Sequence, residues 1–320
     1  MKQIIPFISN SDNDTQTEWL NSLRQAMPNY RILPFAELTS HDKTESTVAI
    51  VANPSIAEVD QLPNLKWVQS LWAGVENLVK SELDMSVKIV KLTDERLSQT
   101  MVEAAIASTF YLHREIPVYR RQQIVGEWSQ RPVALASERT VGVLGLGALG
   151  ACVANQLATL NFNVFGWSRS VRSGEKGDNA PEVECFHGQN GLMEVLRRSE
   201  ILIVLLPLTQ ETHGLLDTKK LSVLPKGASV INFARGPIVV EQDLLGLLDS
   251  DHLNHAVLDV FDHEPLEPSH AFWQHKQITV WPHIAAPTDK RSASRIVAIN
   301  LDKYFVVGEI PRTIDREREY

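Results

Sequence analysis

Cysteine is scarce in this sequence: the 320 residues include only Cys152 and Cys185. The two cysteines form neither a CxxC pair nor a cluster with histidine at metal-ligand spacing. This pattern predicts no metal site and excludes a small fold held together by disulfides. We interpret both residues as reduced thiols of a cytoplasmic protein.

The sequence also lacks long apolar runs. Its longest, residues 201–208, is too short to cross a bilayer and is typical of a buried strand. Residues 1–10 contain no extended hydrophobic region and no small-residue cleavage site, and Asp12 and Asp14 follow directly. We therefore expect no signal peptide, no membrane partner and a cytoplasmic location.

Positive charge is in short supply. Lysine and arginine number 31 against 39 acidic residues, which gives a formal net charge of −8 at pH 7. Nucleic acids and anionic membranes attract an acidic protein only through a strong local basic patch, and no block of like charge would form one. We expect no nucleic-acid partner. Internal repeats and low-complexity tracts are also absent, which excludes a repeat protein.

Hydrophobic residues, by contrast, make up 43% of the chain. A single hydrophobic core stops growing at about 250 to 300 residues, so a chain of this length is expected to form two domains. Small ligands usually bind in the cleft between such domains, and a small-molecule partner is therefore expected.

Short β-branched runs alternate with amphipathic segments along the chain, a pattern typical of parallel sheets covered by helices. A helix is predicted over residues 15–27 and ends at Pro28. The strands of the first part of the chain are predicted at residues 4–8, 30–34, 47–51, 67–71 and 87–91.

A second series of strands begins after Thr140 and forms a complete doubly wound domain by itself. Helices predicted over residues 100–119 and 288–307 frame it, so we expect the chain to cross between domains twice. The strands of this series are predicted at residues 141–144, 164–167, 183–186, 201–206, 229–233, 256–260 and 278–281.

A glycine fingerprint, GxGxxG, follows the first strand of this second series and precedes a helix-forming run at residues 151–160. In this setting the pattern is typical of a dinucleotide-binding βαβ unit. Gly145 would allow a tight turn, Gly147 would let the backbone approach a pyrophosphate, and Gly150 would let helix and strand pack closely. The alternative is a glycine-rich turn without a ligand.

The amides of Ala148 and Leu149 would face the phosphates with the positive end of the helix dipole. We therefore assign residues 101–287 to a Rossmann dinucleotide-binding domain. It is inserted into a flavodoxin-like substrate domain formed by residues 1–100 and 288–320. The predicted fold class is α/β, with two doubly wound parallel-sheet domains.

The second strand of this dinucleotide-binding domain ends without the acidic residue that NAD-binding domains place there for the ribose hydroxyls. Ser168, Arg169 and Ser170 follow instead, with Arg172 close behind and no acidic residue before Glu175. An arginine with two hydroxyls can bind the 2′-phosphate of NADP by charge-assisted hydrogen bonds, whereas a carboxylate would repel it. The sequence predicts NADP as the cofactor, with NADPH preferred over NADH. Solvated surface arginines are the alternative.

Three polar residues, Arg235, Glu264 and His283, each follow an apolar strand at the edge where α/β sheets bind ligands. Taken singly, each could be an ordinary surface, turn or structural residue. Together they provide a cation for a carboxylate, a proton donor for a carbonyl oxygen, and an acid that keeps the donor protonated. This is what the reduction of a 2-oxo acid demands.

With these residues in this order, the chain resembles the D-2-hydroxyacid dehydrogenases along essentially its whole length. The resemblance rests on Phe-Ala-Arg-Gly at residues 233–236, Asp-Val-Phe-Asp-His-Glu-Pro-Leu at 259–266 and Pro-His-Ile-Ala-Ala at 282–286, in that order behind the glycine fingerprint. It implies that Arg235 binds and polarises the substrate, that His283 is the general acid/base, and that Glu264 pairs with His283. Trp281, which precedes the Pro-His pair, and the absence of glycine after it depart from the family pattern.

The same resemblance implies further binding residues. Asp259 would contact the nicotinamide carboxamide, and the amides of Ala73 and Gly74 would cradle the substrate carboxylate. Trp72, in the same loop, would limit substrate length, or else be a core or dimer-contact residue. The remaining implied cofactor-binding residues are Leu206, Pro207, Thr209, Phe233 and Ala234.

Within the family, the sequence resembles most the glyoxylate/hydroxypyruvate reductase branch, through Trp-Ser-Arg-Ser at residues 167–170 and the terminal segment 314–320. This branch implies an NADPH-dependent reductase of small 2-oxo acids that forms a homodimer. Two alternatives stay open: a dehydrogenase for another D-2-hydroxy acid, such as D-lactate or phosphoglycerate, and a non-catalytic dinucleotide-sensing protein.

Overall fold

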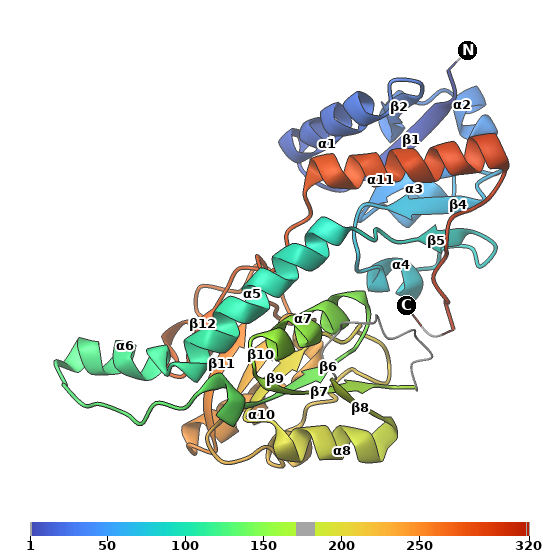
Figure 1. Cartoon of the computed structure of the whole chain (residues 1–320). Coiled ribbons are helices and arrows are strands. Elements are labelled where there is room, and N and C mark those ends of the chain that lie inside the picture. Colours follow the sequence, from blue (N-terminus) through green and yellow to red (C-terminus); the bar gives the residue numbers. More distant parts are fainter. Residues whose placement is uncertain (1, 171–182, 318, 320) are drawn as a thin grey trace. The chain divides into compact units, whose positions relative to one another are not determined.

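The computed structural model of the chain describes residues 2–170, 183–317 and 319. Two compact units are present (Figure 1). Unit 1 consists of Met1–Leu97 and Thr288–Tyr320, and unit 2 consists of Ser98–Pro287. No helix within the described residues has both the length and the apolar character needed to cross a membrane.

Unit 1 contains a parallel five-stranded sheet in the order β2-β1-β3-β4-β5. This order is that of flavodoxin-like folds. The strands are β1 (Ile4–Ser9), β2 (Arg31–Pro34), β3 (Val48–Ala52), β4 (Trp67–Ser70) and β5 (Lys88–Val90). The helices are α1 (Asn13–Ala26), α2 (Ser40–Glu45), α3 (Ile56–Val59), α4 (Glu76–Lys80) and α11 (Lys290–Asp302).

Helix α1 begins two residues before its predicted start. Asp12 is the reason, because its carboxylate accepts a hydrogen bond from the Thr15 amide at 2.8 Å and so satisfies an amide of the first turn. Helices α1 and α11 lie side by side over the sheet of unit 1 (Figure 1). Leu23 of α1 and Val297 of α11 are fully buried in the core beneath them.

Unit 2 contains a parallel seven-stranded sheet in the order β12-β11-β10-β9-β6-β7-β8. Renumbered from β6, this is the 3-2-1-4-5-6 order of a Rossmann fold with one more strand at the edge. The strands are β6 (Thr140–Leu144), β7 (Asn163–Ser168), β8 (Glu184–His187), β9 (Ile201–Val204), β10 (Ala228–Asn232), β11 (Leu253–Leu258) and β12 (Ile278–Val280).

Helices cover both faces of this sheet. Buried residues of α5 and α7, such as Ala105 and Leu157, join one apolar cluster, and those of α8 and α10, such as Leu196 and Leu248, join another. The predicted fold class is therefore confirmed in both units. The helices of unit 2 are α5 (Glu95–His113), α6 (Ile116–Val125), α7 (Ala148–Thr159), α8 (Gly188–Arg198), α9 (Thr218–Leu221) and α10 (Glu241–Asp249), and the first residues of α5 belong to unit 1.

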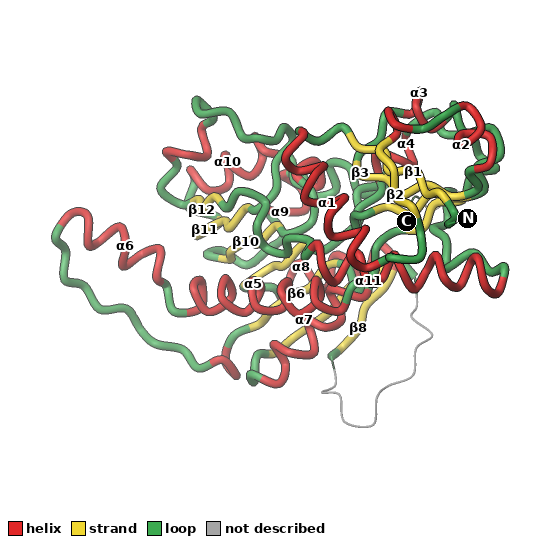
Figure 2. Tube along the Cα trace, turned by 90° about the horizontal axis from the view of Figure 1, so that it is seen from above, coloured by secondary structure: helices red, strands yellow, loops and turns green. Residues whose placement is uncertain are grey.

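The single helix predicted over residues 100–119 is wrong in its second half. Helix α5 ends at His113, Glu115 has a left-handed backbone with φ 53°, and α6 begins at Ile116. Pro117 has no amide hydrogen to donate and fits only the first turn of a helix, so a new helix starts there. Both views show that α6 and the loop after it extend away from the sheet of unit 2 (Figures 1 and 2).

Candidate active site

The candidate residues of unit 2 lie at one edge of the sheet, because parallel strands place their carboxyl ends together. Arg235 follows β10, Glu264 follows β11 and His283 follows β12. These three strands are neighbours in the sheet, so the loops that carry the three side chains are adjacent.

Glu264 and His283 form a hydrogen-bonded pair. The imidazole Nδ1 lies 2.7 Å from Glu264 Oε2, while Glu264 Oε1 accepts from the Phe261 amide at 2.9 Å. The bond to Glu264 raises the pKa of His283 above its ordinary value, against the effect of burial. Burial alone would raise the pKa of Glu264, but hydrogen bonds from His283 and Phe261 outweigh it and the pKa is lowered. The geometry favours a protonated imidazole held by a carboxylate.

The backbone at His283 is held in an unusual conformation. Its φ is 54°, in the left-handed region that non-glycine residues rarely adopt. Asp259 holds it there: its carbonyl accepts from the His283 amide at 3.0 Å, and its carboxylate accepts from the amides of Ile284 at 2.7 Å and Ala285 at 3.0 Å. Burial raises the pKa of Asp259, although these two amides counteract it.

Asp259 was predicted only as a contact of the nicotinamide. In the structure its side chain is buried, and both carboxylate oxygens accept hydrogen bonds from the segment after His283. A supporting role in the placement of His283 was not foreseen, because the two residues lie on different strand ends and sequence spacing does not show hydrogen-bond partners.

The loop that carries Arg235 is shaped by a buried asparagine. Asn232 accepts from the Ala234 amide at 3.1 Å and donates to the Arg235 carbonyl at 3.0 Å. The half-buried Arg235 donates to the Ala234 carbonyl at 2.6 Å. Its charge contributes to the lowered pKa of Glu264 and opposes part of the rise in the pKa of His283. The structure thus brings the three predicted residues into one electrostatic cluster.

The glycine fingerprint forms a turn whose shape fits a dinucleotide. Gly145 has φ 100°, and a Cβ there would lie 2.5 Å from the Leu205 carbonyl oxygen. A Cβ on Gly150 would lie 1.8 Å from the Gly145 carbonyl oxygen, so helix α7 packs against the turn only with glycine at this position.

The start of α7 is open. Gly147 is exposed, and a Cβ there would meet no atom of the described residues within 4 Å. Among the same residues, no side chain caps the helix. The amides of Ala148 and Leu149 in the first turn are therefore available to an anion. These residues fit the pyrophosphate of a dinucleotide.

The end of β7 carries the residues predicted for the 2′-phosphate. The Ser168 hydroxyl donates to the Ser170 carbonyl at 2.9 Å. Arg169 Nη1 lies 2.8 Å from Glu211 Oε2, and this ion pair was not predicted. Arg172 and Glu175 lie outside the described residues.

Glu211 belongs to the turn that follows β9. In this turn the Thr209 amide donates to the Thr212 hydroxyl at 2.8 Å, and that hydroxyl donates to the Pro207 carbonyl at 2.6 Å. Leu206 and Thr209 are buried and Pro207 is exposed. Thr209 thus shapes the turn, a function that its predicted role in cofactor binding did not include.

Phe233 and Ala234 are also buried, each with 4% of its surface exposed. The ring of Phe233 stacks on Trp281, with centroids 5.3 Å apart and an interplanar angle of 25°. Trp281, which departs from the family pattern, thus supports the loop of Phe233: Trp281 follows β12 and Phe233 follows β10.

In unit 1, the loop predicted to bind the substrate carboxylate follows β4 and contains Trp72, Ala73 and Gly74. The Trp72 amide donates to the Ser70 hydroxyl at 3.0 Å, and its carbonyl accepts from the Leu92 amide at 3.0 Å. The Trp72 ring packs edge-on against Trp19, with centroids 5.7 Å apart, beside the core of unit 1. This packing favours the interpretation of Trp72 as a core residue.

The next two residues of this loop, Ala73 and Gly74, are partly exposed. Their amides donate to no protein group in the described part of the chain. They therefore keep the capacity to bind an anion such as a carboxylate.

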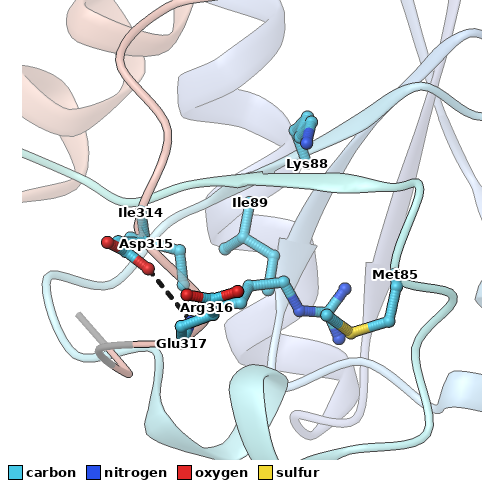
Figure 3. A pocket seen from close by; sticks show the side chains of 7 residues that line it. All are labelled: Met85, Lys88, Ile89, Ile314, Asp315, Arg316 and Glu317. Carbon is cyan, nitrogen blue, oxygen red and sulfur yellow. Dashed lines mark hydrogen bonds between the residues drawn. The ribbon is translucent and has the colours of Figure 1, made fainter.

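A separate pocket of about 240 Å³ lies in unit 1 where the C-terminal segment crosses the edge strand β5 (Figure 3). The Ile314 amide donates to the Ile89 carbonyl at 2.9 Å, and Arg316 donates to the carbonyls of Asp84 and Leu83. The segment thus covers an edge of the sheet. No predicted site residue contributes to the pocket, which is lined by Met85, Lys88, Ile89, Ile314, Asp315, Arg316 and Glu317.

Comparison with known proteins gives consistent matches. The family model described as D-isomer specific 2-hydroxyacid dehydrogenase, NAD binding domain, matches residues 106–285. A D-isomer specific 2-hydroxyacid dehydrogenase from Xanthobacter autotrophicus Py2, solved with NADPH and MES, is 35% identical over 100% of both chains, with a TM-score of 0.90.

Two further solved structures are similar over nearly the whole chain. An NADPH-dependent glyoxylate/hydroxypyruvate reductase of Sinorhizobium meliloti (SmGhrA), solved with NADP and sulfate, is 28% identical over 100% of both chains, with a TM-score of 0.89. A D-isomer specific 2-hydroxyacid dehydrogenase family protein from Klebsiella pneumoniae 342 is 29% identical over 98% of this chain and 97% of its own, with a TM-score of 0.85.

Proposed function

The chain belongs to the D-isomer specific 2-hydroxyacid dehydrogenase family, and on that premise we propose that it reduces small 2-oxo acids, glyoxylate and hydroxypyruvate, with NADPH. The products are the corresponding 2-hydroxy acids. The observation that carries the proposal is the contact between His283 Nδ1 and Glu264 Oε2 at 2.7 Å, at the same sheet edge as Arg235.

Each of the three residues has a role in this reaction. The guanidinium of Arg235 binds the 2-oxo acid and polarises its carbonyl group. His283 donates the proton from Nε2 to the carbonyl oxygen, while Glu264 holds Nδ1 and keeps the ring protonated until then. NADPH, when bound, supplies the hydride that adds to the carbonyl carbon. Proton and hydride together convert the carbonyl into a secondary or primary alcohol, and the imidazole is left neutral.

The cofactor is proposed from the residues at two strand ends. The turn of Gly145, Gly147 and Gly150 and the open start of α7 hold the pyrophosphate. Arg169, with Ser168 beside it, binds the 2′-phosphate. Two of the similar structures were solved with NADPH or NADP, which supports this assignment.

The substrate class is proposed from the reductase-branch motifs and from the similarity to the S. meliloti reductase. A panel of glyoxylate, hydroxypyruvate, pyruvate and phosphohydroxypyruvate, each with NADPH and NADH, tests it through kcat/KM. Glyoxylate and hydroxypyruvate with NADPH are expected to be the best pairs. Phosphohydroxypyruvate as the best substrate would overturn the substrate assignment and favour a phosphoglycerate-type dehydrogenase.

We also propose that the protein is a homodimer. Helix α6 and the loop after it extend from unit 2 (Figure 2). They carry large exposed apolar side chains, among them Ile124 with 80% and Trp128 with 93% of its surface exposed. Apolar side chains gathered on an extended segment are typical of an interface, and a symmetric dimer is the commonest assembly. The other large exposed apolar residues of α6 and the loop after it, residues 116–135, are Ile116, Tyr119, Val125, Val133 and Leu135.

Light scattering after size-exclusion chromatography tests the dimer. The intact protein should have twice the chain mass of 35.9 kDa, and replacement of Trp128 by aspartate should shift it toward the monomer. A monomeric wild-type protein would contradict the proposal.

A further inference from the structure

Arg169 is already engaged by an acidic residue. Its Nη1 lies 2.8 Å from Glu211 Oε2, with 37% of the arginine side chain and 66% of the glutamate side chain exposed. The two residues come from different strand ends, since Arg169 follows β7 and Glu211 belongs to the turn after β9. A carboxylate thus lies against the guanidinium that we assign to the 2′-phosphate.

The turn that carries Glu211 is well ordered by its own hydrogen bonds. Thr209 and Thr212, on either side of Glu211, are buried, with 4% and 9% of their surface exposed. The amide of Thr212 and that of His213 donate to the Thr209 carbonyl, and the Thr212 hydroxyl is bonded to Pro207. The backbone of Glu211 is therefore anchored on both sides, and from this position its carboxylate reaches the guanidinium of Arg169.

We propose that Glu211 is a specificity-determining residue that weakens the binding of NADP relative to NAD; the proposal rests on the assignment of Arg169 to the 2′-phosphate. The carboxylate acts against the phosphate in two ways. It occupies a donor of the guanidinium that the phosphate needs, and it repels a group that carries almost two negative charges. NAD has a hydroxyl at that position and is not subject to this repulsion. The protein therefore binds NADP less tightly than Arg169 alone would allow.

Equilibrium binding to the full-length chain tests the proposal without reference to activity. The dissociation constants of NADP⁺ and NAD⁺ are measured by calorimetry for the wild type and for Glu211→Gln, which keeps the size and polarity of the side chain. We expect NADP⁺ to bind about two- to fivefold more tightly to the variant, which corresponds to the usual strength of an interaction between exposed charges. NAD⁺ binding should stay within about twofold, and added salt should reduce the gain for NADP⁺.

Glu184→Gln is the matched control. Glu184 also pairs with an arginine, Arg198, at 3.1 Å, and 56% of its side chain is exposed, but it lies at the amino end of β8. This variant has the same net charge as Glu211→Gln and should bind NADP⁺ like the wild type. An unchanged NADP⁺ dissociation constant in Glu211→Gln, or an equal gain in Glu184→Gln, would overturn the proposal.

Arg169→Ala distinguishes a failure of the 2′-phosphate assignment of Arg169 from a failure of the role proposed for Glu211. If it weakens NADP⁺ and Glu211→Gln has no effect, the 2′-phosphate assignment stands and the role of Glu211 is wrong. If Arg169→Ala leaves NADP⁺ binding unchanged, the assignment of Arg169 itself fails, and with it the basis of this proposal.

Discussion

The imidazole Nδ1 of His283 lies 2.7 Å from Oε2 of Glu264, and this contact raises the pKa of the histidine. Reduction needs the protonated ring, so the rate should fall as pH rises through that pKa. In Glu264→Gln the charge that raises the pKa is lost, and the fall should move to lower pH. The measurement is the pH dependence of kcat/KM for glyoxylate with NADPH.

Glu241→Gln provides a control for this profile, because Glu241 also faces a histidine, His270, at 3.4 Å elsewhere in unit 2. That variant should keep the wild-type profile. A profile of Glu264→Gln that coincides with the wild type would show that Glu264 does not set the protonation of His283.

The cofactor preference should depend on Arg169. Charge-assisted hydrogen bonds contribute about 1.5–3 kcal/mol each, so one or two of them give NADPH a preference of roughly ten- to several-hundredfold in kcat/KM. Arg169→Ala should remove most of this preference by weakening NADPH while NADH changes little. Steady-state kinetics with both cofactors measure it.

Arg197→Ala removes an exposed arginine from the last turn of α8 and serves as the control for net charge. It should leave the preference unchanged. Equal use of both cofactors by the wild type, or equal damage to both in Arg169→Ala, would mean that Arg169 is a solvated surface residue.

His255 predicts a stability effect at low pH. The side chain is buried, its Nε2 lies 2.9 Å from the Thr279 hydroxyl, and burial lowers its pKa from 6.5 to about 3. Near the ordinary histidine pKa, the unfolded chain takes up a proton at His255 and the folded chain does not. The contribution of His255 to the free energy of unfolding is therefore fully present above that pH and is lost as pH falls below it. Between about pH 7 and pH 4.5 the loss from this residue alone is about 3 kcal/mol.

Urea unfolding followed by tryptophan fluorescence at both pH values tests this difference. His255→Gln keeps a polar partner for Thr279 but has no proton to take up. It should lose about 3 kcal/mol less stability than the wild type over the same pH interval. Equal losses in both proteins would show that His255 is not the group responsible.

Much of the fold could be predicted from the sequence, because strand periodicity and glycine spacing are local. The strands of both units were found to within a few residues, and the fold class and the family are confirmed. The break between α5 and α6 was not predicted, because apolar residues occur on both sides of Arg114 and Glu115 and indicate one continuous helix. In the structure a new helix begins at Ile116, with Pro117 in its first turn.

The site was only partly predictable. The pair of Glu264 and His283 followed from their motifs, and the structure places them in contact. The bonds from Asp259 to the segment after His283, and the ion pair of Arg169 with Glu211, join residues far apart in the sequence. Such partners depend on how strand ends meet in the folded sheet, which residue type and spacing do not show.

The most direct test of the account is the turnover of His283→Ala with glyoxylate and NADPH, beside His263→Ala, which removes an exposed histidine from the loop before Glu264. Loss of a general acid typically lowers turnover by about 10²–10⁴-fold. We predict a loss of that size in His283→Ala, with an NADP⁺ dissociation constant close to that of the wild type, and near-normal turnover in His263→Ala. Near-normal turnover in His283→Ala would contradict the account.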